Sequence, residues 1–289
     1  MGSVRNWLED AVRRVRTFAY GPPAPAPARP KVGLALGGGF ARGIAHIGVL
    51  KVLEANRVPV DCIAGTSVGA LIAASYACGA PLAGLERLAA ATQFKDFARW
   101  TLSWMGLASN ERLENYLQRV CAVSKFEELK IPLAIAATDL GTGEAVYFTR
   151  GEIGPPLRAS CAYPGLFLPV EHEGRILVDG FLAAAVPVEA ARSLGADIVI
   201  AVYLESGGDA PPKTMAEIIS RSFSIMQRHA QQSWRKDADA VIEPLVKGYT
   251  WDDFSKTPEL IAAGEAAARA AMPRILAALA PQRESSVHN

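Results

Sequence analysis

The chain has 289 residues, 50% of them hydrophobic and 20% charged, and its formal net charge is +1. This length suits one sizeable α/β domain better than two small ones, and the near-neutral charge excludes the clustered basic face of a nucleic-acid-binding protein. No apolar stretch reaches the roughly 18 residues that span a bilayer, and the first residues lack the apolar segment of a secretory signal. The chain is therefore expected to be a cytoplasmic globular protein.

Residues 1–20 are expected to form a basic amphipathic helix that stands apart from the rest of the chain. Within residues 4–19, apolar side chains recur at helical spacing opposite a row of arginines. Such a helix can lie in a membrane interface as a peripheral contact, or it can pack on the domain or on a partner subunit. Both alternatives stay open, and these features do not determine the oligomeric state.

Residues 21–30 (GPPAPAPARP) predict an extended, semi-rigid linker. The globular domain is expected to cover residues 31–280, with a flexible tail at 281–289. Alternating apolar strands and helices along this domain predict a mainly parallel sheet covered by helices on both faces. The expected strands are residues 32–37, 58–64, 132–137, 145–149, 175–178 and 198–203. The expected helices are residues 41–55, 68–77, 81–98, 110–123, 214–236 and 258–280.

The four cysteines, Cys62, Cys78, Cys121 and Cys161, lie far apart and lack the spacing of metal ligands. Cys62 and Cys161 fall in apolar strand-like segments. The cysteines are therefore expected to be buried free thiols in a reducing compartment, and no metal site is expected.

Ser67 stands in the pentapeptide GTSVG, between an apolar strand and a segment with helical periodicity. Gly65 and Gly69 leave room for a sharp turn that lifts the serine hydroxyl out of the backbone. The helix that follows directs free N–H groups and the positive end of its dipole toward the same point. Ser67 is thus a candidate nucleophile. The alternative is a glycine-rich turn with a capping serine.

The first strand ends in GGGFARG (residues 37–43), which leads into a helix. Free N–H groups in such a loop bind an anion, yet the loop has neither the spacing of a dinucleotide-binding motif nor the Gly-Lys-Ser/Thr ending of a P-loop. With Ser67 on the next strand, the loop favours an oxyanion hole, which stabilises the charge formed during acyl transfer. Arg42 is expected to shape this loop or add positive charge, unless it is a plain surface arginine.

A nucleophilic serine needs a base, and the histidines are weak candidates. His46 is expected to pack inside a helix, His172 to face solvent between two glutamates, and His288 to lie in the tail. His229 follows the Ser…Asp…His order of α/β-hydrolases but stands in a polar helical segment with no loop to bring it to a site.

Asp179 is the stronger candidate for the base. It follows an apolar run and precedes Gly180, so it is expected to end a strand at the edge where α/β sheets carry their sites. A partly desolvated carboxylate at this position gains basicity and can take the serine proton. The alternative is a turn-forming Asp-Gly pair.

Together these segments resemble the patatin-like phospholipase family, in particular its bacterial cytoplasmic members. The match runs over roughly residues 31–280 in the order GGGFARG with IAHIGVL, GTSVG, ASCAYPGLFLPV (159–170) and VDGF (178–181) with VPV. The resemblance implies a three-layer α/β/α fold and metal-free hydrolysis of acyl esters by a Ser–Asp dyad, with no cofactor. It assigns the nucleophile to Ser67 and the base to Asp179. It places Gly37, Gly38, Gly39 and Arg42 in the oxyanion loop and Pro164 and Pro169 in a segment beside the site.

The chain departs from the family pattern at Phe40, at Phe181 and at Ala184–Ala185, where the family often has a small residue, Gly or Ala, and Asn-Pro respectively. The expected function is still a serine acyl hydrolase that cleaves lipid or other acyl esters. The aromatic residues 94–107, including Trp104, are expected either to cover an acyl chain or to pack in the core. The alternative functions are a regulatory protein on the same fold and an anion- or nucleotide-binding protein.

Overall fold

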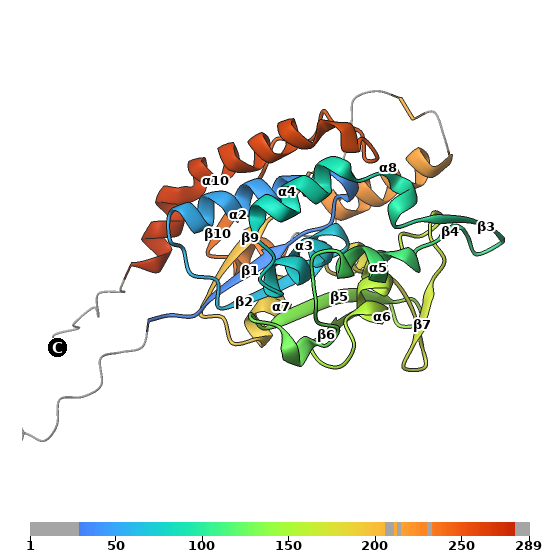
Figure 1. The fold of residues 1–289 in the computed structure, drawn as a ribbon, viewed down its shortest axis with the longest axis horizontal. Helices are drawn as coiled ribbons and strands as arrows, with labels where there is room; N and C mark the ends of the chain where they lie inside the picture. Colours follow the sequence, from blue (N-terminus) through green and yellow to red (C-terminus); the bar gives the residue numbers. More distant parts are fainter. Residues whose placement is uncertain (1–28, 206–210, 213–214, 230–232, 281–289) are drawn as a thin grey trace, which may run out of the picture.

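The computed structural model describes residues 29–205, 211–212, 215–229 and 233–280. The expected helix at 4–19, residues 21–28 of the linker and the tail at 281–289 lie outside the described residues. The described part forms a central sheet between two layers of helices, as Figure 1 shows. The predicted α/β/α architecture is confirmed.

The main sheet has eight strands in the order β10-β9-β1-β2-β5-β8-β7, and β6 also pairs with β5. The five strands from β10 to β5 are parallel, whereas β6, β8 and β7 add antiparallel pairs on one side. The sheet is thus mixed and mostly parallel, as predicted. The strands are β1 Val32–Leu36, β2 Cys62–Thr66, β5 Leu133–Asp139, β6 Ala145–Phe148, β7 Val170–His172, β8 Arg175–Asp179, β9 Ile198–Val202 and β10 Ala240–Ile242.

The two faces of the sheet carry side chains of different size. Large residues such as Leu34, Leu36 and Ile63 face the bulky layer of helices that includes α2, α3 and α10. Small residues such as Ala35 and Ala64 face the short helix α7, and their size lets this helix approach the strands closely. The helices are α2 Ala45–Ala55, α3 Val68–Ala77, α4 Leu82–Ala91, α5 Arg112–Gln118, α6 Gly154–Ser160, α7 Val188–Ser193, α8 Met215–His229, α9 Trp234–Asp237 and α10 Thr257–Leu279.

Several expected boundaries change in the structure. The helix expected at 81–98 ends at Ala91, because Thr92 and Gln93 are extended and Gln93 starts a separate 3-10 turn. The helix expected at 41–55 begins as a 3-10 turn, Phe40–Ile44, and the one expected at 214–236 divides into α8 and α9. The strand expected at 58–64 begins only at Cys62, since the N–H of Val58 still closes the end of α2 on the carbonyl of Leu53.

A two-stranded hairpin outside the main sheet was not predicted. Its strands are β3 Arg99–Ser103 and β4 Gly106–Ser109, and Figure 1 shows it projecting from one end of the molecule. The periodicity of this aromatic segment did not indicate a strand pair.

No helix in the described part of the chain is both long enough and apolar enough to cross a membrane.

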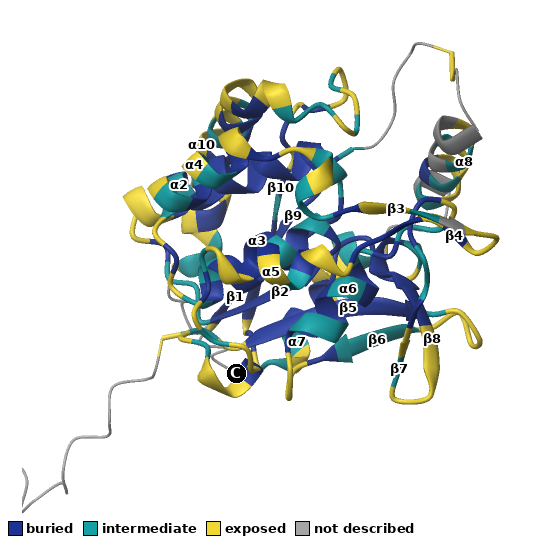
Figure 2. Cartoon of the chain, turned by 45° about the vertical axis from the view of Figure 1, so that its right-hand side comes forward, coloured by how far each residue is buried: buried dark blue, intermediate teal, exposed yellow. Residues whose placement is uncertain are grey.

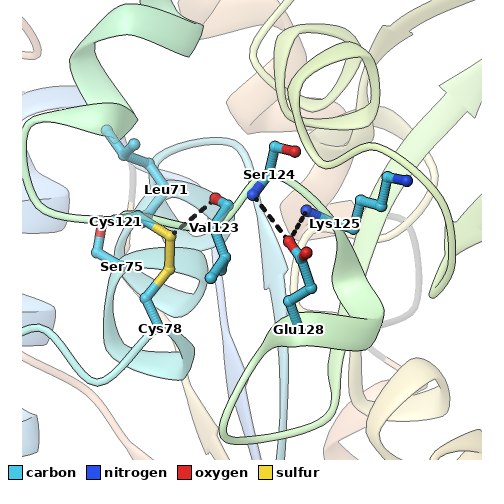
Figure 3. Close-up of a disulfide and its surroundings, with 8 residues drawn as sticks. All are labelled: Leu71, Ser75, Cys78, Cys121, Val123, Ser124, Lys125 and Glu128. Carbon is cyan, nitrogen blue, oxygen red and sulfur yellow. Dashed lines mark hydrogen bonds between the residues drawn. A yellow bond between two sulfur atoms is a disulfide. The ribbon is translucent and has the colours of Figure 1, made fainter.

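The expectation of free thiols is wrong for two of the cysteines. Cys78 and Cys121 form a disulfide that joins the C-terminal end of α3 to the segment after α5, as Figure 3 shows. Only the packing of α3 against α5 brings these residues together, since 43 positions separate them in the chain. Cys62 and Cys161 are free. The pairing removes the support that the cysteines gave to a reducing compartment.

Candidate active site

Ser67 lies between β2 and α3, at the sharp turn that its pentapeptide predicts. Its backbone has φ +56°, a conformation that is strained for a residue with a side chain. A Cβ atom at Gly65 would lie 2.4 Å from Cα of Ala70, and one at Gly69 would lie 2.3 Å from the carbonyl oxygen of Leu36. Both positions therefore require glycine, because the start of α3 packs directly on the ends of β1 and β2.

The structure brings Asp179 to Ser67. The hydroxyl Oγ of Ser67 donates a hydrogen bond of 2.7 Å to Oδ2 of Asp179, and the N–H of Phe181 donates one of 2.9 Å to Oδ1. Both residues are buried, with 6% and 1% of their surfaces exposed. A hydroxyl bonded to an adjacent carboxylate is the arrangement in which a proton can leave the serine as it attacks.

The route by which Asp179 reaches this place differs from the prediction. A mainly parallel sheet predicts that Asp179 ends a parallel strand, whereas β8 runs antiparallel to β5. Asp179 pairs in register with Ala137, and the neighbouring Ala136 pairs with Thr66 on β2. The aspartate is thus level with the end of β2 because β8 enters the sheet from the edge that carries the site.

The burial of Asp179 alters its acidity. Removal from water raises the pKa of its carboxyl from the ordinary 3.8 to about 7, and the hydrogen bonds from Phe181 and Ser67 oppose this rise. A carboxylate with this pKa takes and returns a proton near neutral pH. Burial likewise raises the pKa of the neighbouring Cys161 thiol well above its ordinary value, so Cys161 remains a thiol.

Ser160 holds the backbone of Ser67 and was not identified from the sequence. Its Oγ accepts the N–H of Ser67 at 2.8 Å and donates to the carbonyl of Ala136 at 2.6 Å. This side chain is fully buried. No local pattern marks Ser160, because it reaches Ser67 from the C-terminal end of α6, 93 residues along the chain.

The Gly-rich loop lies beside Ser67, but its three glycines do not offer their amides equally. The N–H of Gly37 donates to Val202 at 3.0 Å, and that of Gly38 donates to Ala185 at 3.3 Å. Among the described residues, the N–H of Gly39 has no acceptor. Gly39 is therefore the donor that is free to meet an oxyanion, and Gly38 is available only if its long bond to Ala185 opens.

His46 contacts the Gly-rich loop with its side chain. Its ring is completely buried, and Nε2 lies 2.8 Å from the carbonyl oxygen of Gly37. Burial lowers the pKa of His46 from 6.5 to about 4, so the ring is neutral and Nε2 carries the proton that it donates to the carbonyl. The expectation of a packed helix histidine is confirmed.

Arg42 is buried, with 7% of its surface exposed, so it is not a plain surface arginine. Its Nε donates to the carbonyl of Gly39 at 3.4 Å. No carboxylate among the described residues forms an ion pair with it, and burial lowers its pKa below the ordinary value, with the nearby Tyr163 and Tyr203 opposing this. The guanidinium remains charged, so Arg42 shapes the loop and also adds an unneutralised positive charge.

Of the other histidines, His172 is the one whose side chain the structure describes, and no described hydrogen bond joins it to Ser67 or Asp179. His172 lies on β7, where its ring packs against Phe148 at 5.4 Å between centroids. His229 is the last residue of α8, and His288 lies outside the described residues. In the described part of the chain, no group of three or more His, Cys, Asp or Glu side chains is placed to hold a metal ion.

The departures from the family pattern surround the site. Phe181 is buried, and its ring lies against Gly38. The carbonyl of Ala184 accepts the hydroxyl of Thr66 at 2.7 Å. Phe40 has φ +53° and packs against Tyr163, Phe167 and Trp251. The ring of Phe40 is thus the centre of an aromatic cluster near Ser67.

Two cavities share Ser67 and Phe40 in their walls. The first, here called the outer cavity, is lined by Gly39, Phe40, Arg42, Ser67, Tyr163, Pro164, Gly165, Leu166, Phe181, Ile219, Ser224 and Trp251. The second, here called the apolar cavity, is lined by Phe40, Ile44, Ser67, Val68, Leu71, Ile72, Ala89, Thr92, Phe97, Asn110, Leu113, Tyr116, Cys161, Phe167 and Phe254. Pro169 lines neither.

The aromatic residues of 94–107 take up the two expected roles only in part. Phe97 lines the apolar cavity, and Phe94 packs on Phe97 and Phe167. Trp104 is fully exposed at the tip of the β3–β4 hairpin. Trp104 therefore fulfils neither expected role, since it lines neither cavity and does not pack in the core.

Comparison with known proteins identifies the class to which this fold and site belong. The model of the patatin-like phospholipase family matches residues 34–192, a span that includes both Ser67 and Asp179. The chain is also 34% identical over 225 residues to an uncharacterized NTE family protein of Mycobacterium bovis, with 69% of this chain and 59% of the relative covered. The chain belongs to the patatin-like phospholipase family, whose members are generally serine hydrolases.

More distant comparisons extend the match. The lysophospholipase nte1 of Aspergillus fumigatus is 31% identical over 203 residues, which cover 68% of this chain and 13% of that protein. The chain thus spans well under two thirds of the length of these relatives. Among solved structures, VipD from Legionella pneumophila aligns with a TM-score of 0.51 at 14% identity, covering 87% of this chain and 67% of VipD. The type III effector protein ExoU aligns with a TM-score of 0.50 at 14% identity, covering 88% and 54%. These two likenesses show the fold.

Proposed function

We propose that this chain is a serine acyl hydrolase that cleaves carboxylic esters of lipids through Ser67 and Asp179. The observation that carries the proposal is the 2.7 Å hydrogen bond from Ser67 Oγ to Asp179 Oδ2, at a point where two cavities meet. Family membership supports a lipid substrate.

In the first half of the reaction, the carboxylate of Asp179 takes the proton of Ser67 as Oγ attacks the ester carbonyl carbon. The carbonyl oxygen becomes an oxyanion, which the amide of Gly39 stabilises, with Gly38 as the second donor. Collapse of the tetrahedral intermediate breaks the bond to the alcohol oxygen. Asp179 returns the proton to that oxygen, so an alcohol leaves and the acyl group remains on Ser67.

In the second half, Asp179 takes a proton from water, whose oxygen attacks the acyl carbon. The second tetrahedral intermediate collapses by releasing Ser67 Oγ, and Asp179 returns the proton to it. A carboxylic acid leaves, and both side chains are restored. The pKa of about 7 suits Asp179 to act as base and acid in turn.

The two cavities suit the two parts of a phospholipid. The apolar cavity is lined by aliphatic and aromatic side chains from α3, α5 and the turn at Phe254, so it takes the acyl chain. The outer cavity holds the buried guanidinium of Arg42, which has no carboxylate partner among the described residues, so it takes a group with a negative charge. Guanidinium pairs well with phosphate oxygens, which favours a phospholipid or lysophospholipid. The Aspergillus relative is a lysophospholipase, which supports the same substrate class.

The direct test is hydrolysis of para-nitrophenyl esters of increasing acyl length by wild type, Ser67→Ala and Asp179→Asn. Activity in wild type that is lost in both variants supports the dyad, and a preference for long acyl chains supports the apolar cavity as their site. Equal activity in Ser67→Ala and wild type would contradict the proposal.

The assignment of the phosphate to Arg42 has its own test. In Arg42→Gln, hydrolysis of a lysophospholipid should fall by about tenfold more than hydrolysis of a neutral para-nitrophenyl ester, because only the former carries a phosphate for the guanidinium. Hydrolysis of both substrates depends on the loop that Arg42 shapes. The loss of activity that is common to both substrates therefore measures this structural role. An equal loss on both substrates would overturn the phosphate assignment.

One observation favours a second candidate, a regulatory protein with weak or absent catalysis. The N–H of Gly38 is bonded to Ala185, and the ring of Phe181 lies against Gly38, so the second oxyanion donor is occupied. A fluorophosphonate ester distinguishes the candidates, because it labels an activated serine covalently. Labelling of wild type but not of Ser67→Ala favours the hydrolase, whereas no labelling of folded wild type favours the regulatory protein.

A further inference from the structure

The β3–β4 hairpin presents large apolar side chains to solvent. Trp104 and Met105 form the turn between the strands, and their surfaces are 106% and 63% exposed. Trp100 and Leu107, on the two strands, are 66% and 43% exposed. Figure 2 shows this exposed hairpin at one end of the molecule. Exposed apolar side chains gathered in this way mark an interaction site more often than isolated ones do.

Beyond Arg99 at its base, the hairpin carries no charge. From Trp100 to Asn110 the chain has no Asp, Glu, Lys or Arg, and the charged Arg99 and Glu111 stand just outside this span. Arg99 and Glu111 pair with each other at 3.4 Å at the base of the hairpin. No ionised side chain therefore has to lose its hydration when the protruding part enters an apolar medium.

The base of the hairpin is joined to the walls of both cavities. The amides of Leu107 and Ala108 donate to the carbonyl of Leu166 at 3.0 and 2.9 Å, and the amide of Leu168 donates to Ala108 at 3.0 Å. Leu166 lines the outer cavity and Phe167 lines the apolar cavity. Ala108 and Phe167 are buried, so the base of the hairpin is anchored beside both cavities.

Helix α8 lies along the outer cavity, at the same end of the molecule as the hairpin. Its inner face supplies Ile219 and Ser224 to the wall of that cavity, whereas Ile225 and Met226 are 41% and 63% exposed. Figures 1 and 2 both place α8 at the same end of the molecule as the hairpin. The outer face of α8 and the hairpin thus lie beside the same cavity.

We propose that the β3–β4 hairpin docks the protein on an uncharged lipid–water interface, next to the outer cavity. Indole rings favour the boundary between lipid and water, because one end is apolar and the other carries a polar N–H. This inference rests on the proposed function. The hairpin lies beside the cavities, and lipid esters that react at Ser67 must come from such an interface.

A second protein is a weaker occupant for this surface. An aromatic side chain buries about 150–250 Å², so the two exposed tryptophans with Met105 and Leu107 offer less than the roughly 800 Å² per partner of a standard interface. Insertion into lipid needs no such area, because each inserted side chain contributes separately.

The test is sedimentation of the full chain with phosphatidylcholine vesicles, in the Ser67→Ala background so that no lipid is consumed. The double variant Trp104→Ala/Met105→Ala should bind these vesicles about tenfold or more weakly than its parent. The matched control is Leu276→Ala, because Leu276 is 51% exposed near the end of α10, away from the hairpin. The control should bind as the parent does. Raising salt from about 0.1 M to about 0.5 M should leave binding unchanged, since the hairpin has no charged residue between Trp100 and Asn110.

Equal vesicle binding by the double variant and its parent would overturn the docking proposal. So would a dimer that the double variant loses while its vesicle binding stays the same, because the surface would then serve a second copy of the chain. In the active background, the double variant should hydrolyse a soluble short-chain ester as wild type does and vesicle lipid about tenfold more slowly. Loss of vesicle binding with no ester hydrolysis by wild type would remove the proposed function and leave the docking surface standing.

Discussion

The hydroxyl of Ser160 accepts a hydrogen bond from the backbone N–H of Ser67 at 2.8 Å and donates one to the carbonyl of Ala136 at 2.6 Å. This bridge connects α6, the turn after β2, and β5 at the point where the backbone of Ser67 has φ +56°. A strained residue keeps such a conformation only where its surroundings hold it. Ser160 is therefore a positioning residue for Ser67.

Replacement of Ser160 by Ala should lower kcat on a para-nitrophenyl ester by about 10- to 100-fold, because a small displacement of Oγ disturbs its geometry with Asp179. The free energy of unfolding should fall by about 1–3 kcal/mol, since two buried groups lose their partner. The matched control is Ser75→Ala on α3, which removes a buried hydroxyl bonded within its own helix. The control should lose stability and keep its kcat. Parallel loss of kcat in both variants would mean that Ser160 only stabilises the fold.

The activity should depend on pH through Asp179. Only its ionised form accepts the serine proton, so kcat/KM should rise with pH and level off above about 7. The measurement is the pH profile of kcat/KM on a soluble ester between about pH 5 and about pH 9. His46 cannot produce this limb, because its pKa is about 4. His46→Asn should therefore leave the midpoint in place, and a wild-type midpoint near 4 would refute the assignment to Asp179.

The same burial makes Asp179 costly for stability at neutral and alkaline pH. An unfolded aspartate ionises near 3.8, whereas Asp179 in the folded chain ionises at about 7. Between these values the folded state binds a proton that the unfolded state lacks, so stability falls as pH rises through this window. Asp179→Asn should remove this fall and raise the free energy of unfolding at about pH 8 by up to about 4 kcal/mol, with little effect at about pH 4.

Urea unfolding of wild type and Asp179→Asn at both pH values measures this effect. The control is Asp252→Asn, because Asp252 is exposed and its substitution should leave the pH dependence as it is in wild type. A variant that is less stable than wild type at alkaline pH would show that the hydrogen bonds of the carboxylate outweigh its desolvation.

The disulfide between Cys78 and Cys121 should stabilise the fold. It closes a loop over a separation of 43 residues, for which the chain-entropy account gives about 4 kcal/mol. Reduction should lower the unfolding midpoint of wild type, and a reductant should have no further effect on the double variant Cys78→Ala/Cys121→Ala. The unfolded, unreduced chain should show two reactive thiols, from Cys62 and Cys161. Four reactive thiols would contradict the pairing.

Much of the candidate site was predictable because its geometry is local. The turn at Ser67 depends on Gly65, Gly69 and the strand and helix that flank them, all of which are neighbours in the chain. Neighbouring residues in the chain likewise indicate the Gly-rich loop before a helix and the aspartate after an apolar strand. The resemblance to a family then joined these segments into one site, which hydrophobic periodicity alone does not do.

The sequence by itself determined the alternation of strands and helices, the turn at Ser67 and the candidacy of Asp179, because each depends on residues adjacent in the chain. Only the tertiary structure decided that β8 runs antiparallel, that Ser160 and His46 hold Ser67 and Gly37, and that the amide of Gly39 finds no acceptor in the described part of the chain. The same is true of the disulfide and of the exposed Trp104. These features depend on contacts between residues far apart in sequence, and such contacts exist only once the helices have packed on the sheet.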